Sequence, residues 1–306
     1  MLSGMEAFLS EAGRVVLSAS RRTDIPAFYM DWFMARLEAG FFSVTNPYNR
    51  QAHIIPAAPG QVAGVVFWSK DYGDFLARGF GPRLLDRGLG LFFHFTVNSS
   101  DPLLEPGVPP LEKRLAQFSA LARIAPPKAI SWRFDPVCHY SRDGGPTRDN
   151  LADFERIADA AAAAGVTRCV VSFMDFYPKI RKRLREHPGL VFSDPPKERK
   201  VEILRRLSER LAGRGMALST CCENEAAESA GVSPGACVDH GLLEALFGAV
   251  MSHRSDAGQR KSQGCLCRES RDVGDYGLHP CFHRCLYCYA SPAQARPASP
   301  KEPRRK

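Results

Sequence analysis

The stretch Val62-Ala-Gly-Val-Val-Phe-Trp68-Ser69-Lys70-Asp71 is an apolar run that stops at a hydroxyl and two charges. Almost continuous apolar runs of this length are typical of strands that are covered on both faces of a parallel sheet. Other runs along the chain share the pattern, and most of them also end in polar residues. The predicted strands are Val15–Ala19, Phe42–Thr45, Val62–Trp68, Leu89–Val97, Ala129–Phe134, Thr167–Met174 and Met216–Thr220.

Between these runs lie helical patterns, with apolar residues at every third or fourth position. The predicted helices are Leu111–Ile124, Leu151–Ala164, Lys197–Ala212 and Leu242–Val250, the second of them with Asn150 as its N-cap. Strands that alternate with helices indicate βαβ units and a parallel sheet. We therefore predict an α/β fold, a partial (β/α) barrel of about six to eight mostly parallel strands, with an open doubly wound sheet as the alternative.

The composition is that of a globular protein with a large core, since 44% of the 306 residues are hydrophobic and 24% are charged. No apolar run is long enough to span a membrane, and the N-terminus lacks the basic start and apolar core of a signal peptide. These features predict a cytoplasmic protein without a membrane partner. Ten cysteines in that compartment indicate metal binding rather than disulfides, above all because five fall between Cys265 and Cys288.

Charged and hydroxyl residues follow the ends of the predicted strands, and parallel strands of such folds end at one common rim. The residues predicted to gather there are Arg21, Arg22, Lys70, His94, Arg133, Asp135 and Glu223. Arg133 and Asp135 alternate with apolar neighbours, so both should face the same side of their strand. The sequence thus predicts a polar, positively biased pocket for an anionic or zwitterionic ligand. For the two arginines of the first strand, the alternative is an internal Arg–Asp pair that closes the barrel end.

The character of the sequence changes after about residue 252, where Gly, Pro, Cys, His and Arg dominate and periodicity is lost. The predicted organisation is a barrel domain at 1–251, a cysteine-rich metal-binding segment at 252–292 and a disordered basic tail at 293–306. The net charge of +8 is uneven, and a second basic cluster is the run Lys179-Ile-Arg-Lys-Arg-Leu-Arg185. Because this run directly follows a predicted strand, nucleic acid is an alternative partner, although no known reading motif accompanies it.

Cys281, Cys285 and Cys288 form a C-x3-C-x2-C triplet near the end of the sequence. Three thiolates can hold one metal centre and leave a coordination position open, whereas a structural zinc ion takes four protein ligands. A zinc site is the alternative, and it would need His279, His283 or another cysteine as its fourth ligand.

Cys265 and Cys267 form a separate C-x-C pair, which can donate two thiolates to one metal. Together with Cys221 and Cys237 the pair would make a four-thiolate set. The sequence therefore also predicts a second centre, which would be either an additional cluster or a zinc ion. The alternatives are that the pair merely lies near the first centre, or that only one of the two cysteines is a ligand.

The run Cys281-Phe-His-Arg-Cys285-Leu-Tyr287-Cys288 resembles the motif of the radical S-adenosylmethionine superfamily, including the aromatic residue before the last cysteine. That resemblance implies a full or partial (β/α) barrel with a [4Fe-4S] cluster on the three thiolates. It also implies that the remaining iron binds S-adenosylmethionine and that an electron donor is needed. The residues we expect to bind the cofactor and substrate are Arg21, Arg22, Asp24, Lys70, Arg133, Asp135 and Tyr287.

Further segments resemble the branch of that superfamily that contains spore photoproduct lyase. They are Val-Phe-Trp-Ser-Lys70, Phe-His-Phe-Thr96, Glu105-Pro, Glu112-Lys-Arg-Leu and Trp-Arg133-Phe-Asp135-Pro. Over nearly its whole length the chain resembles an uncharacterised bacterial family, domain of unknown function 1848. The segments that carry this second resemblance are Ser18–Tyr29, Phe67–Lys70, Trp132–Pro136 and Cys265–Ala290.

The triplet follows the last predicted strand, whereas in the radical superfamily it follows the first. We therefore predict that the C-terminal segment folds back over the strand-end rim and brings residues 281–288 close to Arg21, Lys70 and Arg133. The function that these expectations favour is a radical enzyme that generates a 5′-deoxyadenosyl radical on an unknown substrate. The alternatives are a zinc- or cluster-binding barrel that contacts nucleic acid, and an iron–sulfur protein used for redox sensing or electron transfer.

Overall fold

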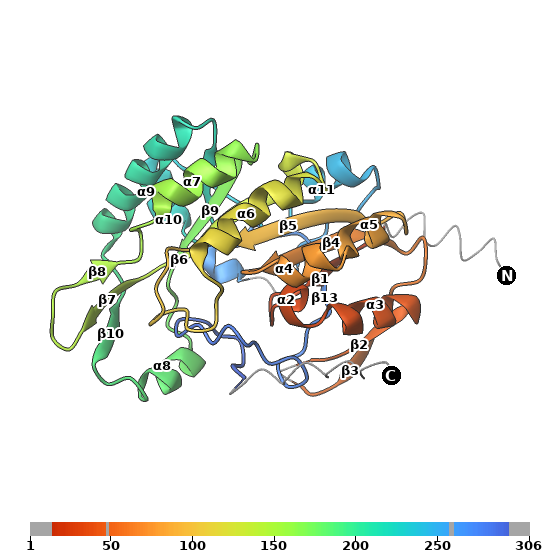
Figure 1. The fold of residues 1–306 in the computed structure, drawn as a ribbon, viewed down its shortest axis with the longest axis horizontal. Coiled ribbons are helices and arrows are strands. Elements are labelled where there is room, and N and C mark those ends of the chain that lie inside the picture. The colour runs from red at the N-terminus through yellow and green to blue at the C-terminus, as the bar shows by residue number, and fades with distance from the viewer. Residues whose placement is uncertain (1–13, 47–48, 257–259, 294–306) are drawn as a thin grey trace, which may run out of the picture.

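The computed structural model describes residues 14–46, 49–256 and 260–293, and its centre is an eight-stranded parallel sheet (Figure 1). Its strands are β1 (Val15–Ala19), β4 (Val62–Ser69), β5 (Gly90–Thr96), β6 (Ile130–Val137), β9 (Arg168–Phe173), β11 (Ala217–Thr220), β12 (Ser233–Pro234) and β13 (Arg271–Asp272). Every neighbouring pair in the sheet runs parallel. The α/β class and the parallel sheet are therefore confirmed.

The spatial order of the strands is β12-β11-β9-β6-β5-β4-β1-β13. From β1 to β12 the strands lie side by side in chain order, and the last strand, β13, returns to the free edge of β1. This is the strand order of an eight-stranded barrel, except that no ladder joins β12 to β13 in the described part of the chain. The sheet is a barrel opened at one seam, which agrees with the predicted partial barrel.

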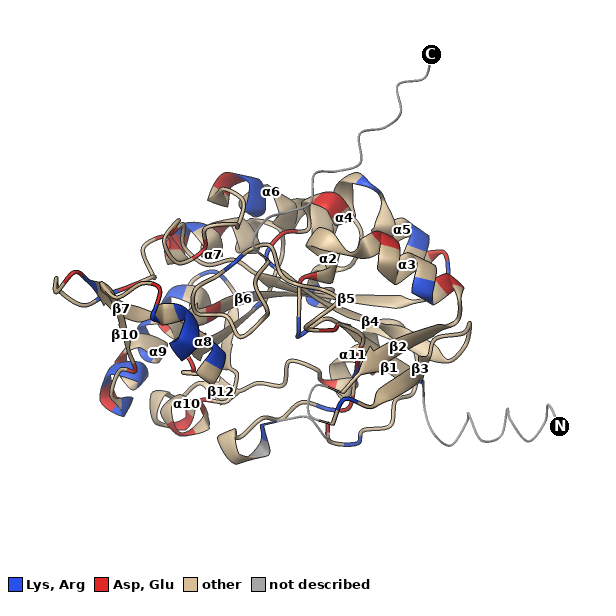
Figure 2. Cartoon of the chain, turned by 90° about the horizontal axis from the view of Figure 1, so that it is seen from below, with Lys and Arg blue, Asp and Glu red and all other residues tan. Residues whose placement is uncertain are grey.

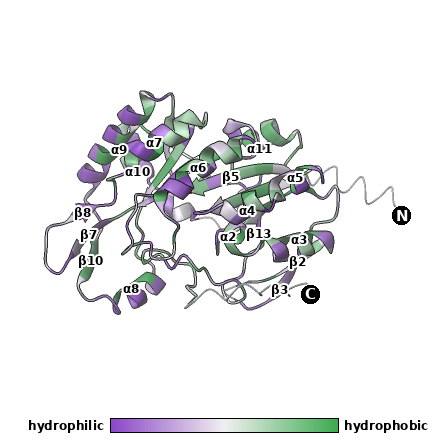
Figure 3. Ribbon diagram, viewed as in Figure 1, coloured by the Kyte–Doolittle hydropathy of each residue, from purple (hydrophilic) through white to green (hydrophobic). Residues whose placement is uncertain are grey.

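Helices follow most strands, and most of these helices cover the outer face of the sheet (Figure 1). They are α2 (Ile25–Phe28), α3 (Met30–Glu38), α4 (Gly73–Ala77), α5 (Phe80–Leu85), α6 (Leu111–Ala122), α7 (Phe154–Ala163), α8 (Pro178–Leu184), α9 (Lys197–Ala212), α10 (Asn224–Ala230) and α11 (His240–Phe247), with short 3-10 turns η1 (Pro127–Ala129) and η2 (Lys261–Gln263). Figure 3 shows apolar strands such as β5 and β9 behind helices with hydrophilic outer parts, for instance α9. None of the helices in the described ranges combines the length and the apolar character needed to cross a bilayer.

Two predictions of local structure need correction. The predicted strand Phe42–Thr45 exists as β2 (Phe41–Thr45), but it pairs antiparallel with β3 (Ala52–Pro56) in a separate hairpin. Its side chains alternate between exposed and buried, so only one of its faces is covered. Asn150 does not cap α7, since Asp153 precedes that helix, while the Asn150 side chain accepts a hydrogen bond from the backbone N–H of Cys138 at 2.8 Å.

A second, smaller sheet extends from the strand-end side of the barrel and carries a minor apolar cluster. Its strands are β7 (His139–Arg142), β8 (Arg148–Asp149) and β10 (Leu190–Ser193), in the order β10-β7-β8. Tyr140 and Phe192 of this sheet belong to the same apolar cluster as Cys285, Leu286 and Tyr287. The predicted cysteine-rich segment therefore has no separate core: it packs against the barrel's own insertions and supplies β13. The predicted tail at 293–306 lies outside the described residues except for its first position.

Candidate metal centre

Residues 274–293, which we call the C-terminal cap, lie over the carboxyl ends of the first strands of the sheet. Tyr29, which follows α2, donates its hydroxyl hydrogen bond to the Pro280 carbonyl at 2.6 Å. Tyr289 of the cap donates to the Arg21 carbonyl at 2.8 Å. In Figure 1 the cap is the dark blue segment that runs between α8 and the β2–β3 hairpin. The prediction that the end of the chain folds back over the strand-end rim is confirmed.

The loop after β5 is shaped to receive the cap. The Gly107 N–H donates to the His283 carbonyl at 2.9 Å, and the Leu286 N–H donates to the Leu104 carbonyl at 2.9 Å. A side chain at Gly107 would place its Cβ only 2.3 Å from the Phe282 carbonyl oxygen, so this close approach requires glycine. Backbone pairing with the barrel thus fixes the chain on both sides of Cys285, inside the cysteine triplet.

The thiols of Cys281, Cys285 and Cys288, the first thiol set, lie together in this cap. Cys285 is 4% exposed, and the other two are half-buried. Burial raises the pKa of Cys281 to about 12, and it also raises the pKa of Cys285 and Cys288. Lys70 acts on all three thiols in the opposite direction, because its positive charge favours thiolates. Without a metal the three thiols are therefore protonated, and they would lose their protons when a metal binds.

Arg183 of α8 holds the backbone that carries these thiols. Its Nη1 donates to the carbonyl oxygens of Cys285 at 2.6 Å and Cys288 at 2.8 Å, and its Nη2 donates to the Ala290 carbonyl at 3.1 Å. Arg183 belongs to the basic run 179–185, which the sequence offered only as a surface for an acidic partner. Figure 2 shows the basic residues gathered on α8. At least one of these charges organises the cap instead of facing solvent.

A buried ion cluster connects the rim to the cap through Glu105. Lys70 Nζ lies 2.9 Å from Glu105 Oε1, and Arg114 Nη1 lies 3.9 Å from Oε2. The Tyr287 hydroxyl donates to the same carboxylate, and Asn98 donates to the Tyr287 oxygen at 2.9 Å. Burial alone would raise the pKa of Glu105, but Lys70 and Arg114 outweigh it, so this pKa is lowered. Lys70 and Tyr287 therefore lie at the rim as predicted, where they bind protein groups.

Asp24 and His283 form a second link between rim and cap. Asp24 Oδ1 caps α2 by accepting from the Ala27 N–H at 3.0 Å, and its Oδ2 accepts from the Lys70 N–H at 2.8 Å. His283 Nε2 lies 2.8 Å from Asp24 Oδ2, and its Nδ1 lies 3.3 Å from the Gly107 carbonyl oxygen. Both nitrogens of His283 thus face oxygen acceptors. His283 is not available as the fourth ligand of a zinc site at the first thiol set.

His279, the other histidine considered as a zinc ligand, is also engaged. Its Nδ1 accepts from the Asp275 N–H at 3.1 Å, and its ring packs on Trp32 with centroids 4.1 Å apart and on Tyr29 with centroids 4.9 Å apart. Burial lowers the pKa of His279, so the ring is a neutral part of an aromatic cluster. The Nδ1 atom of His279 therefore already has a partner within the cap.

The two arginines after β1 are paired within the chain. Arg21 Nη2 lies 2.7 Å from Asp256 Oδ2, and Arg22 Nη1 donates to the Gly274 carbonyl at 3.0 Å. The Arg21 N–H donates to Asp272 Oδ2 at 2.7 Å. We had two expectations for these arginines, ligand binding or an internal Arg–Asp pair, and these contacts favour internal pairing. Their acceptors come from the C-terminal segment rather than from the neighbouring Asp24.

Arg133 and Asp135 face the same side of β6, as predicted. Arg133 Nε lies 3.1 Å from Asp135 Oδ2, and the Ser172 hydroxyl donates to Oδ1. Burial would raise the pKa of Asp135, but Arg133 and Ser172 outweigh it, and the pKa is lowered. With 27% of its side chain exposed, Asp135 is an ionised carboxylate that a ligand can reach. Its negative charge acts on Cys288 of the first thiol set and raises the pKa of that thiol.

The other rim residues have structural partners. His94 Nε2 lies 2.7 Å from the Cys237 carbonyl oxygen, and its ring stacks on Trp68 with centroids 4.2 Å apart. Glu223 accepts from the Phe173 N–H at 3.2 Å and lies 3.5 Å from Lys200. These two residues therefore stabilise the strand ends and are not open to a ligand.

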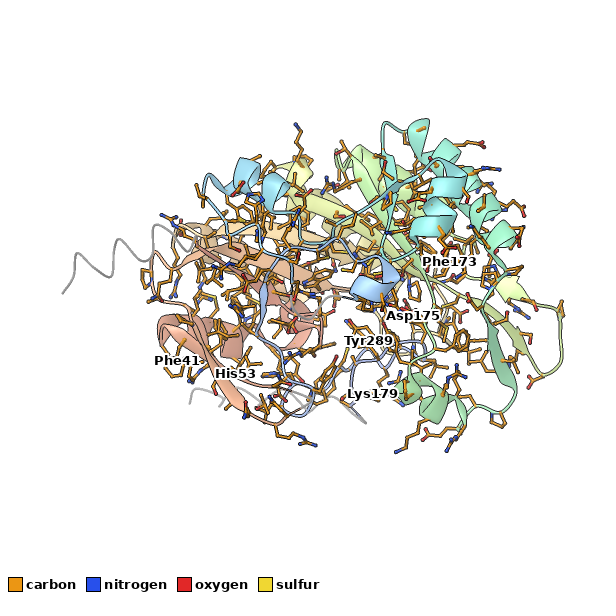
Figure 4. The ribbon with its side chains drawn as sticks, turned by 180° about the vertical axis from the view of Figure 1, so that it is seen from behind. Phe41, His53, Phe173, Asp175, Lys179 and Tyr289 are labelled. Carbon is orange, nitrogen blue, oxygen red and sulfur yellow. The ribbon has the colours of Figure 1, made fainter. Side chains whose placement is uncertain are left out.

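The segment that follows β9 and leads into α8 also lies against the cap. Tyr177 and Tyr289 have ring centroids 5.3 Å apart, and Lys179 Nζ lies 3.9 Å from the Tyr276 ring centroid. Figure 4 shows Asp175, Tyr289 and Lys179 following one another down this side of the molecule. Tyrosines and charges from the segment after β9, from α8 and from the cap thus lie together next to the cysteine loop, a meeting that no sequence pattern predicts.

The four cysteines predicted for a second centre, Cys221, Cys237, Cys265 and Cys267, are brought together near the end of β11. Cys221 and Cys237 have sulfurs 3.6 Å apart, and Cys267 contacts Cys237 and Cys265. Cys222 joins the same group, which the sequence did not predict. Across the described residues, no three Cys, His, Asp or Glu side chains already surround a point where one metal ion could bind. Thiolates of an iron–sulfur cluster do not need to surround one point, because each of them binds a separate iron.

Fold and site together define an α/β protein whose open parallel sheet is closed at its strand-end rim by a cysteine-bearing cap. The chain belongs to the family described as domain of unknown function DUF1848, whose model matches residues 16–290. The match begins in β1 and ends in the cap, so the family's domain contains both the rim and the first thiol set. Among curated proteins the chain has no match.

Proposed function

We propose that Cys281, Cys285 and Cys288 hold a [4Fe-4S] cluster and that the protein is a radical S-adenosylmethionine-type enzyme. One observation carries the proposal: three thiols lie on a loop that is clamped over the strand-end rim, while both nearby histidines have other partners. Such a donor set suits a centre that keeps one position for a small molecule. One-electron cleavage of S-adenosylmethionine to a 5′-deoxyadenosyl radical is the chemistry that a bound cluster would supply.

In this proposal the chain's own residues position the thiols and shield them. Arg183 fixes the carbonyl groups of the cysteine loop, and Glu105 anchors both Lys70 and Tyr287 beneath it. Lys70 offers a positive charge that partly balances a thiolate-bound centre. Because Cys285 is buried at 4% exposure, water has little access to that sulfur.

The proposed binding group for S-adenosylmethionine is Asp135. Its lowered pKa keeps the carboxylate ionised, and the sulfonium and ammonium groups of the cofactor are cationic. Arg133 orients this carboxylate, because its Nε donates to Asp135 Oδ2 at 3.1 Å. Arg21, Arg22, Asp24, Lys70 and Tyr287, which we had expected among the cofactor ligands, become positioning residues in this account, because each already binds a group of the protein.

The proposal implies an electron donor as a partner. It also favours a reducing compartment such as the cytoplasm, because the ten cysteines, all of them within the described residues, form no disulfide. We do not extend it to nucleic acid, since Arg183 and Lys179 of the basic run pack against the cap.

Anaerobic purification followed by iron, sulfide and zinc analysis tests the proposal. We expect about four iron and four sulfide per chain, bound in the wild type and lost in Cys285→Ala. Cys169→Ala is the matched control, because Cys169 is buried in β9 away from the cap. A wild-type protein that carries no iron after reconstitution with iron and sulfide would contradict the proposal.

A further inference from the structure

Five of the ten thiols form a second group that the proposed function does not use. The Cys221 sulfur lies 4.0 Å from that of Cys222 and 3.6 Å from that of Cys237. Cys237 also contacts Cys267, Cys267 contacts Cys265, and Cys265 contacts Cys222. Each thiol therefore touches two others, and the contacts close on themselves. We call this group the thiol ring.

Three separate parts of the fold contribute to the thiol ring. Cys221 and Cys222 follow β11 directly, and Cys222 has a backbone φ of +61°, a value that L-residues rarely adopt. Cys237 comes three residues after β12, and the C-x-C pair precedes β13. The ring thus stands beside the open seam of the sheet, with thiols from both of its sides.

The surroundings of the ring suit thiolates. Arg133 Nη1 donates to the Cys237 sulfur at 2.9 Å. Arg260 adds a second positive charge that acts on Cys221 and Cys222. Cys265 and Cys267 also accept hydrogen bonds from backbone N–H groups. Donors of this kind around thiols are typical of metal sites, where hydrogen bonds orient the ligands and offset their charge.

The spacing of the sulfurs indicates how many metal ions they share. In a tetrahedral site with metal–sulfur bonds of about 2.3 Å, the sulfurs lie about 3.8 Å apart. The separations of 3.6 Å between Cys221 and Cys237 and 4.0 Å between Cys221 and Cys222 bracket that value. Thiolates on different irons of one cluster have to stand farther apart, because iron and sulfide lie between them. In the described residues these sulfurs do not yet surround one point, so binding of a single ion would require four of the five side chains to turn toward it.

We propose that four thiolates of the ring bind one tetrahedral metal ion of the zinc type, which closes the seam between β12 and β13. Binding of the ion releases the thiol protons to solvent, and no electron is transferred. The backbone already approaches across the seam, since the Arg268 N–H donates to the Val238 carbonyl at 2.8 Å and His240 Nε2 lies 2.8 Å from the Glu269 carbonyl oxygen. An ion here would fix the segment that leads into β13 and the cap.

The ratio of five thiols to four ligands makes the proposal testable by stoichiometry. Cys222→Ser leaves four thiols, so we expect it to retain about one zinc per chain. Cys265→Ser combined with Cys267→Ser leaves three, and we expect the zinc to be lost. Cys169→Ala should retain it. Cys285→Ala should lose iron while retaining zinc, which separates this proposal from the function proposed for the first thiol set.

The wild-type protein provides a second readout that does not depend on whether the double variant folds. X-ray absorption at the zinc edge, after growth with added zinc, should show four sulfur neighbours at about 2.3 Å. Replacement by Co²⁺ should give the intense visible absorption of a tetrahedral thiolate site. A zinc-free wild type, nitrogen or oxygen neighbours, zinc retained by the double variant, or extra iron and sulfide in its place would each overturn the proposal. If Cys222→Ser lost its zinc as completely as the double variant, binding by four of the five thiols without Cys222 would be overturned.

Discussion

The Arg183 guanidinium donates to the carbonyl oxygen of Cys285 at 2.6 Å, across 102 positions of sequence. Further bonds to Cys288 and Ala290 make α8 the support of the cysteine loop. A loop without regular secondary structure can hold its thiols in place only if groups of this kind satisfy its backbone. Arg183 is therefore central to the site, although no motif includes it.

Arg183→Met should weaken both the fold and the hold on the metal. Hydrogen bonds from a charged group contribute about 1.5 to 3 kcal/mol each and do not add fully, so we expect a loss of about 2 to 4 kcal/mol. Urea unfolding of the metal-free protein measures this loss, and the rate of iron transfer to a chelator measures the hold on the cluster. Lys182→Met, an exposed change on the same helix, is the control. Equal behaviour of the two variants would contradict the role of Arg183.

Glu105→Gln should destabilise the protein strongly. The substitution leaves Lys70 and Arg114 buried near each other without their shared carboxylate. Breaking a buried ion pair by removing one partner typically costs about 3 to 5 kcal/mol. Glu112→Gln, which removes an exposed carboxylate paired with Arg156, should cost less than about 1 kcal/mol. Chemical denaturation of the two variants compares these costs, and equal values would contradict the account.

The stability difference between the wild type and Glu105→Gln should depend on pH in a definite direction. The folded-state pKa of Glu105 is lowered from 4.5, so its contribution is present above pH 4.5 and is lost as pH falls through the folded pKa. The pKa of Lys70 is raised from 10.5, so its contribution is present below pH 10.5 and is lost as pH rises through the folded pKa. Denaturation across this range should show a plateau between the two values. A difference that grows on acidification would contradict the assignment.

His283→Gln separates the cluster interpretation from a zinc site with a histidine ligand. Because Nε2 and Nδ1 of His283 both face oxygen atoms, we expect the variant to retain its iron. It should unfold more easily, by about 1 to 3 kcal/mol, since Asp24 loses one buried partner. The iron content of His283→Gln is measured together with that of Cys285→Ala. Loss of the metal to the extent seen for Cys285→Ala would make His283 a ligand and contradict our interpretation.

Asp135→Asn should weaken S-adenosylmethionine binding without removing iron. Loss of one charge contact of about 1.4 kcal/mol corresponds to roughly tenfold in Kd. Anaerobic calorimetry on the cluster-loaded protein measures the affinity. Asp143→Asn, at an exposed carboxylate of the β7–β8 turn, is the control. An unchanged Kd for Asp135→Asn would remove Asp135 from the proposed binding site.

The sequence predicts the regular part of this fold well, because long apolar runs and helical periodicity survive in the structure. Predicted helix Lys197–Ala212 and predicted strand Val15–Ala19 have the observed bounds. Strands β12 and β13 were not predicted, because a strand of two residues is too short to show an alternating pattern of apolar and polar residues. Hence the eight-strand order of the sheet, with its seam, could be seen only in three dimensions.

The site was predictable to the extent that its chemistry lies in one short segment. The triplet and its place over the rim could be inferred, whereas its supports come from distant positions. Arg183 and Glu105 are isolated in sequence from the cysteines that they hold. The sequence placed the arginines after β1 at the rim, but it could not show that Asp256 and Asp272 would occupy them. Side-chain partners depend on tertiary packing, which local patterns do not encode.

Electron paramagnetic resonance of the reduced protein, with and without S-adenosylmethionine, tests the central claim most directly. We predict a signal of a reduced [4Fe-4S] cluster in the wild type, absent from Cys285→Ala and present in Cys169→Ala. Addition of S-adenosylmethionine should shift the g-values, because the cofactor would bind at the position that the three thiols leave open. A cluster signal that does not respond to the cofactor, or reduced protein that gives no signal, would contradict the account.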